Sequence, residues 1–147
     1  MKILYLDAFA GISGDMMLGA LLALGLPLHE LEQELARLPL HGYSITATPR
    51  QISGISAIKF DVRIDQSGHT HRTFREIRAM LDKSPLTPAV KCLAIDIFTR
   101  LAQAEGRIHS MQPDDVTFHE LGAVDSVVDI VGTAVGLNWL AAERVYV

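Results

Sequence analysis

The sequence predicts a mixed α/β domain: a mixed sheet with a central N-terminal strand and an antiparallel strand pair, covered by helices. Residues 3–8 are apolar almost throughout, which is typical of a central strand. Between residues 43 and 65 apolar side chains alternate with polar ones at period two, as in strands with one wet face. The second half carries apolar residues at helical spacing.

The N-terminal strand is followed by a glycine-containing loop and two predicted helices. The first helix is expected from about Asp15 to Leu24, where Gly25 is well placed to end it. Pro27 can open the second helix, which Pro39 and Gly42 close. Its predicted core stripe is Leu31, Leu35 and Leu38.

The middle of the chain predicts a strand pair and then a helix. Residues 43–49 and 57–65 have the alternating pattern, and Ser53-Gly54 marks the turn between them. Thr73 and Glu76 have the spacing of a capping box, so a helix should begin just after Thr73.

The C-terminal part predicts two further helices and a strand. Thr87-Pro88 is a cap followed by proline at the first helical position of a long helix. A last helix is expected from about Gly122 to Ala141, and Arg144 begins a strand in which the sequence stops. We therefore expect residues 1–147 to form a single domain, the N-terminal fragment of a longer protein.

Composition limits the partners. The net charge of -4 provides no basic surface for nucleic acid. Cys92 has no second cysteine to pair with, which excludes an internal disulfide and any multi-cysteine metal site. The thiol is expected to be buried in a helix. The apolar run 16–26 is too short to span a bilayer. A cytoplasmic protein with no membrane partner is expected.

Polar residues gather in three blocks, residues 7–15, 68–72 and 118–129, which contain or lie near four of the six histidines. Imidazoles and carboxylates are the usual ligands of borderline transition metals, so the blocks indicate a metal site. His69 and His71 lie two residues apart, which puts both imidazoles on one face of extended backbone. A third ligand must come from elsewhere, and an exposed polar loop explains the pair equally well.

Two other histidines, His29 and His41, are predicted to be surface residues, because their surroundings resemble loops or amphipathic segments. His109 is a possible ligand only because the chain should turn after the long helix, before Pro113.

The first block joins a strand to a helix through Gly11, Ser13 and Gly14. Such a turn exposes backbone N–H groups at a helix N-terminus, where phosphate or carboxylate can bind. It matches neither a P-loop nor a dinucleotide fingerprint. The alternative is that Ser13 or Asp15 caps the helix and the glycines serve only the turn.

The third block predicts a polar stripe on the last helix. The stripe comprises Gly122, Asp125, Asp129, Gly132 and Gly136. Like charges one turn apart are destabilising unless a cation or a hydrogen-bond donor lies between them. We therefore expect the first and third blocks to meet. The alternative is that solvated acids lie at a helix N-terminus and that the glycines permit helix packing.

Together the blocks resemble the LarC family, the nickel insertion proteins that mature the nickel-pincer cofactor of lactate racemase. The resemblance is carried by residues 6–16, 69–72, 98–105 and 118–132, in order and at approximately the family spacing. Residues 26–67 match only in general character. The family usually reads His-Phe-His-Glu at the third block, whereas this chain has Thr117 in place of the first histidine. If that histidine is a ligand, the metal is bound more weakly or differently here.

The resemblance implies a nickel chelatase, a lyase of cofactor biosynthesis that inserts Ni²⁺ into pyridinium-3,5-bisthiocarboxylic acid mononucleotide and uses CTP. CTP and a divalent cation are expected on a C-terminal region that this chain lacks, so the isolated fragment is expected to be inactive. The expected partners are the nickel-pincer nucleotide precursor, the C-terminal domain of the same protein and, in a homo-oligomer, further copies.

Site residues are assigned chemically on the matched positions. The expected metal ligands are His69, His71, His109, His119 and Glu120. The expected cofactor-binding residues are Gly11, Ser13, Gly14 and Asp15, and the expected catalytic residues are Asp7 and Asp125. The alternative is a non-catalytic metal-binding or subunit-assembly module whose glycine–aspartate face packs on another subunit. A hydrolase using Ser13 ranks last, because no histidine–acid partner lies near it in sequence.

Overall fold

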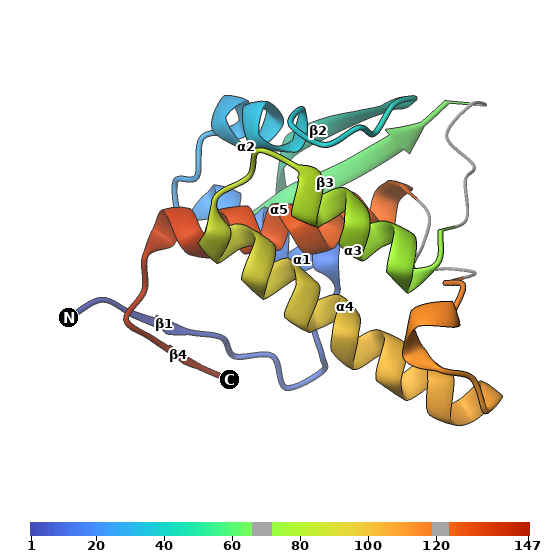
Figure 1. The fold of residues 1–147 in the computed structure, drawn as a ribbon. Helices are drawn as coiled ribbons and strands as arrows, with labels where there is room; N and C mark the ends of the chain where they lie inside the picture. Colours follow the sequence, from blue (N-terminus) through green and yellow to red (C-terminus); the bar gives the residue numbers. More distant parts are fainter. Residues whose placement is uncertain (66–71, 119–123) are drawn as a thin grey trace.

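The computed structural model describes residues 1–65, 72–118 and 124–147, and within them the predicted α/β class is confirmed (Figure 1). The strands are β1 (Ile3–Tyr5), β2 (Tyr43–Ile52), β3 (Ile55–Ile64) and β4 (Arg144–Tyr146). The helices are α1 (Gly14–Ala23), α2 (Leu28–Leu35), α3 (Phe74–Lys83), α4 (Pro88–His109) and α5 (Val124–Leu140), with a 3₁₀ turn, η1 (Pro113–Asp115).

The strands form two separate sheets, and the prediction of one mixed sheet around a central N-terminal strand is wrong for the described residues. β1 pairs in parallel with β4, with Ile3 opposite Arg144, whereas β2 and β3 form the predicted antiparallel pair. Figure 1 shows α1 and α5 between the two sheets. β1 has only three residues, and the space beside the hairpin is filled by α1, so the two sheets cannot meet.

Close packing of α1 against both α5 and β3 forms the centre of the core. A Cβ added to Gly132 would lie 3.1 Å from the Leu18 side chain, and a Cβ added to Gly136 would lie 2.7 Å from that of Leu21. A Cβ on Gly19 would lie 2.3 Å from the carbonyl oxygen of Ile58 in β3. Leu18 and Leu21 meet Gly132 and Gly136 in ascending order, so α1 and α5 run in the same direction.

The sequence signals for helix starts are confirmed. α3 follows Thr73, whose side chain and that of Glu76 form both bonds of a capping box. α4 begins at Pro88, directly after Thr87. α1 begins at Gly14, one residue before the predicted start. No helix among the described residues is long and apolar enough to cross a membrane.

Two predictions about single side chains have opposite outcomes. Cys92 is exposed, so the prediction of a buried thiol is wrong. The buried face of α4 contains Val90 and Ala94, and Cys92, two residues from each, lies about 200° around the helix from them. His29 and His41 are exposed, as predicted.

Candidate functional site

The described residues bring parts of the predicted site together at two places. The first is the pair of N-termini of α1 and α5, where Asp15, Asp125 and Asp129 form what we call the carboxylate cluster. The second is an antiparallel bridge between Thr73 and Thr117, which we call the strand bridge. Each place joins segments that are far apart in the sequence.

A tight turn leads from β1 into α1. Gly11 adopts φ +88°, a left-handed conformation that glycine tolerates, and its N–H donates to the Ala8 carbonyl at 2.9 Å. Ser13 is the N-cap of α1, but its hydroxyl donates to the Asp15 carboxylate instead of accepting from the helix backbone. The N–H groups of the first turn of α1 therefore have no side-chain cap from Ser13.

Gly14 and Asp129 form the contact that joins the first block to the third. A Cβ on Gly14 would lie 2.6 Å from the Asp129 Cβ and 2.9 Å from its Oδ2. Such a separation is below any normal contact, so only glycine lets the two helices approach this closely. The predicted meeting of the first and third blocks is therefore seen in the structure.

Asp129 lies in an unfavourable environment for a negative charge. Burial, together with the nearby charges of Asp15 and Asp125, raises the pKa of its carboxyl from the ordinary 3.8 to about 6. Its Oδ1 is buried and has no hydrogen-bond partner among the described residues. The Asp125 Oδ1 accepts a bond from the Ser126 N–H at 2.8 Å. The carboxylate cluster therefore favours a cation and disfavours a free anion.

Asp7 lies apart from this contact. It is exposed in the segment between β1 and α1, and no hydrogen bond or ion pair joins it to Asp125 within the described ranges. The two predicted catalytic acids are therefore not a directly bonded pair.

The strand bridge places the border of the second block beside the border of the third. The Phe118 N–H donates to the Arg72 carbonyl at 3.3 Å, and the Phe74 N–H donates to the Val116 carbonyl at 2.9 Å. His69 and His71 precede Arg72, whereas His119 and Glu120 follow Phe118, and these four residues lie outside the described residues. The spacing of the motifs gave no sign of this pairing.

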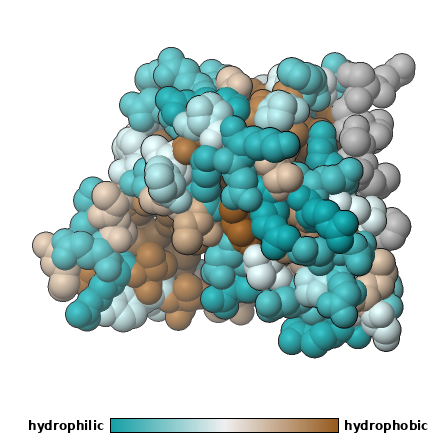
Figure 2. All heavy atoms as spheres, viewed as in Figure 1, coloured by the Kyte–Doolittle hydropathy of each residue, from teal (hydrophilic) through white to brown (hydrophobic). Residues whose placement is uncertain are grey.

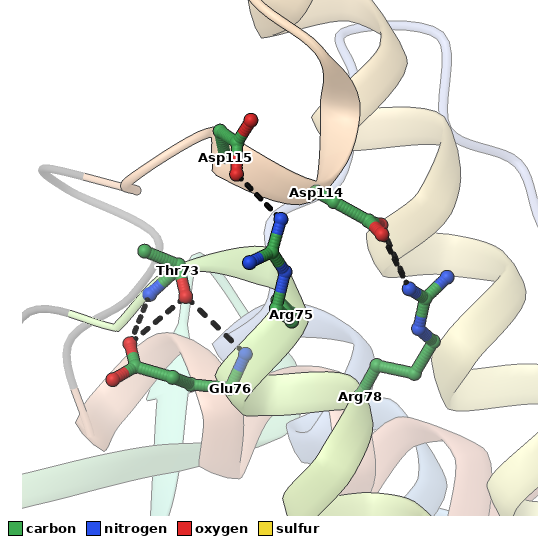
Figure 3. Close-up of polar contacts among 6 residues, drawn as sticks. All are labelled: Thr73, Arg75, Glu76, Arg78, Asp114 and Asp115. Atoms are coloured by element: carbon green, nitrogen blue, oxygen red, sulfur yellow. Dashed lines mark hydrogen bonds and ion pairs between the residues drawn. The ribbon is translucent and has the colours of Figure 1, made fainter.

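Two ion pairs fix α3 to η1 beside the strand bridge (Figure 3). Arg75 lies 2.7 Å from an Asp115 oxygen, and Arg78 bonds both oxygens of Asp114 at 2.7 and 2.8 Å. Exposed ion pairs contribute little individually. Here two of them act on the same short segment, which leads directly into the bridge.

The capping box at Thr73 adds a third polar constraint. The Glu76 carboxylate accepts from the Thr73 N–H at 2.7 Å and from the Thr73 hydroxyl at 2.9 Å, and these bonds lower the pKa of Glu76. The backbone of Thr73 is therefore held by its own helix (Figure 3), while its neighbours Arg72 and Phe74 form the hydrogen bonds of the strand bridge.

Buried aromatic rings pack against one another at the strand bridge. Phe118 packs edge-on against Phe74, with ring centroids 6.5 Å apart, and at 6.0 Å from Phe98 of α4. The Arg78 guanidinium lies 5.1 Å from the centre of the Phe74 ring. These contacts anchor both sides of the bridge to the core.

His109 lies at the exposed C-terminal end of α4. Its Nε2 is 3.3 Å from the Glu105 Oε2, one helical turn away. Within residues 1–65, 72–118 and 124–147, no three His, Cys, Asp or Glu side chains are grouped closely enough to hold a metal ion. The structure therefore gives His109 a local partner and does not bring it to another described candidate ligand.

Comparison with known proteins agrees with a metal-handling role. The family described as nickel insertion protein matches residues 4–147. The chain belongs to the nickel insertion protein family. It is 49% identical over 146 residues to the "Putative nickel insertion protein" of Geobacter sp. (strain M21) and 50% identical over 148 residues to the protein of that name from Wolinella succinogenes.

The matched segments cover nearly all of this chain but less than half of each relative. The matches include 99% of this chain but 38% of the Geobacter protein and 37% of the Wolinella protein. No solved structure matches the chain significantly.

Proposed function

We propose that this chain is the N-terminal part of a nickel chelatase that inserts Ni²⁺ into pyridinium-3,5-bisthiocarboxylic acid mononucleotide, as the precursor of the nickel-pincer cofactor. CTP and its divalent cation are bound by the part of the longer relatives outside the match. Membership of the nickel insertion family supports the metal, and the LarC resemblance suggests the nucleotide and CTP. We propose that the reaction takes place in the cytosol, where the single Cys92 would stay reduced.

The observation that best supports the proposed nickel site is the hydrogen bond between the Phe118 N–H and the Arg72 carbonyl. His71 and His119 are each one peptide bond from this pair in the sequence. We propose that they share one Ni²⁺ with His69 and Glu120, because Ni²⁺ binds imidazole readily and accepts carboxylate. The ion is substrate, so weak binding suits a site that must release it.

The carboxylate cluster is proposed to receive the cation-bound end of the nucleotide. The first-turn N–H groups of α1, with Gly11, Ser13 and Gly14, are suited to a phosphate. Three carboxylates nearby repel a bare phosphate, so we propose that the phosphate arrives with a divalent cation. Because no three of the described acidic side chains are grouped closely enough to hold that cation alone, most of its ligands would come from the nucleotide. Asp15 and Asp129 are proposed to contact that cation.

Asp7 and Asp125 are proposed to act as acid–base groups during insertion, since a metal displaces protons from its ligands. His109 remains a proposed accessory ligand, in competition with Glu105. Nickel binding should weaken as pH falls through the imidazole range.

The two alternatives receive less support. A subunit-assembly role needs a free glycine–aspartate face, but α1 covers Asp129, Gly132 and Gly136 within the same chain. A serine hydrolase of the usual kind needs a histidine base beside Ser13, whereas the side-chain bond of that hydroxyl is to the carboxylate of Asp15.

Replacing the matched 146 residues of the Geobacter protein by this chain gives a full-length test protein. With Ni²⁺, CTP and the bisthiocarboxylate nucleotide, it should form the nickel-bound nucleotide, whereas the isolated 147 residues should not. The product is detected by mass spectrometry. A chimera that binds Ni²⁺ and CTP but leaves the nucleotide unmetallated would contradict the proposed reaction.

A further inference from the structure

The β1–β4 pair is an open sheet. The Leu6 N–H donates to the Tyr146 carbonyl and the Glu143 N–H donates to the Lys2 carbonyl, both at 2.8 Å, so the even-numbered residues of β1 face β4. Neighbouring strand residues direct their backbone groups to opposite sides. Ile3 therefore faces outward, and it forms no backbone hydrogen bond outside the pair among the described residues.

The backbone groups of Tyr5 in β1 and Val145 in β4 also face away from the partner strand. Neither residue forms a backbone hydrogen bond to another element within the described ranges. Parallel sheets are normally extended and covered on both faces, because a parallel pair is weak alone. An unpaired edge of this kind is a template for a further strand.

Apolar side chains are exposed on the same pair. Tyr5 is 69% exposed, Val145 49% and Val147 87%. Figure 2 shows hydrophobic residues around a hollow at the lower left, where Figure 1 places β1 and β4. A contiguous exposed apolar surface on a folded domain is typical of an interaction site.

Further exposed apolar side chains lie in the part of the chain that leads from β1 to the carboxylate cluster. Phe9 is 96% exposed in the segment after β1, and Ile12 and Met16 are exposed on either side of the α1 N-cap. Met16 is the neighbour of Asp15 in the sequence.

We propose that the β1–β4 pair accepts a further β-strand from the polypeptide that accompanies this domain in its longer relatives. This strand is expected to come from the same polypeptide, because the chain covers 38% of the Geobacter relative and the larger part of that protein lies outside the match. The added strand forms main-chain bonds with an open edge, and its apolar side chains cover the exposed face. This pairing is independent of the proposed nickel chemistry.

Hydrogen exchange of single amides tests the proposal. The chimera described above is compared with the isolated 147 residues at the amides of Ile3, Tyr5 and Val145, with Leu18 as a core control. We expect the amides of one edge to exchange at least ~10-fold more slowly in the chimera, because hydrogen-bonded amides exchange only when the structure opens. That edge is either β1, reported by Ile3 and Tyr5, or β4, reported by Val145. Equal rates at all three amides, with Leu18 protected in both proteins, would overturn the proposal.

Proline variants identify the edge. Val145→Pro removes an outward N–H and leaves the β1–β4 bonds in place, because proline is tolerated where the N–H faces solvent. Ile3→Pro does the same at the opposite edge, and Val145→Thr is the control that keeps the N–H. One proline should abolish the added protection, and the proposal is overturned if neither does.

Sedimentation of the isolated chain tests whether a second copy of the chain, instead of the accompanying polypeptide, binds the open edge of the β1–β4 pair. A dimer that Val145→Pro or Ile3→Pro dissociates would assign the edge to self-association and overturn the proposal, whereas a monomer supports it. If the chimera misfolds, the exchange comparison is made between the intact Geobacter protein and its own matched segment, with the same criterion.

Discussion

Gly14 lies against Asp129 so closely that a methyl group on Gly14 would come within 2.6 Å of the Asp129 Cβ. This contact joins the N-terminus of α1 to the first turns of α5. It leaves one carboxylate partly buried beside two others. The chemistry proposed for the cluster depends on this separation.

Gly14→Ala should push the two helices apart. We expect a loss of about 1–3 kcal/mol in the free energy of unfolding, because the added methyl overpacks the contact. Urea unfolding measures it. Gly132→Ala is the matched control, since its Cβ would meet the flexible end of Leu18 at 3.1 Å, and it should cost less. A Gly14→Ala protein as stable as wild type would contradict the contact.

Asp129→Asn should stabilise the protein at neutral pH. The folded-state pKa of Asp129 is about 6, above the ordinary value of 3.8, so the protonated form is favoured on folding. Its contribution to stability is fully present below pH 3.8 and is lost as pH rises through 6.

The asparagine mimics the neutral carboxyl and should gain on the order of 1 kcal/mol at about pH 7.5, reduced by partial solvent screening, and almost nothing near about pH 4. Thermal unfolding across this range measures the difference. Asp82→Asn, at an exposed position on α3, is the charge control and should show a flat profile. An Asp129→Asn advantage that is equal at the two pH values would show that Asp129 is ionised normally.

Asp125→Asn should leave stability nearly intact and reduce nickel insertion by the full-length chimera. The amide oxygen can still accept from the Ser126 N–H, while the charge needed for acid–base chemistry is lost. Initial rates and unfolding midpoints are measured together. Unchanged insertion would remove Asp125 from the reaction and leave it as a helix-terminal residue.

Thr117→His should strengthen nickel binding. Thr117 pairs with Thr73 in the strand bridge, next to Phe118. The LarC pattern that the sequence resembles implies a histidine at this position. An added imidazole at the border of the proposed site should lower the Kd roughly tenfold, the lower end of the effect of residues that support metal ligands. Gln51→His, on the exposed end of the hairpin, controls for nonspecific binding. Equal affinities for the two variants would place position 117 outside the site.

Local sequence signals predicted the helices well because their causes are local. The Thr73–Glu76 capping box and Pro88 each define a start from a few neighbouring residues. The alternation around residues 43–65 likewise predicted a strand pair, because its period of two reflects one buried face.

Long-range pairing could not be read from the same signals. The apolar residues after Ile3 suggested a central strand, but apolar character does not say which strand is the neighbour, and β1 pairs with β4 alone among the described strands. Thr73 and Thr117 are far apart in the sequence, and nothing in their local surroundings requires a bridge. The meeting of the first and third blocks could be predicted, because Gly11 and Gly14 permit a close approach to the Asp125 and Asp129 face. The expected relief of like charges is not seen, because the contact brings a third acid, Asp15, beside Asp129.

The two histidine-containing blocks next to the strand bridge are proposed to share one nickel ion. Calorimetric titration of Ni²⁺ into wild type, His71→Ala, His119→Ala and the double variant tests it directly, with His29→Ala as the exposed control. We expect each single variant to lose nearly as much affinity as the double, because ligands of one ion act together. The His69→Ala/His71→Ala pair should behave in the same way. Strictly additive losses, or heats equal to wild type, would contradict a shared site.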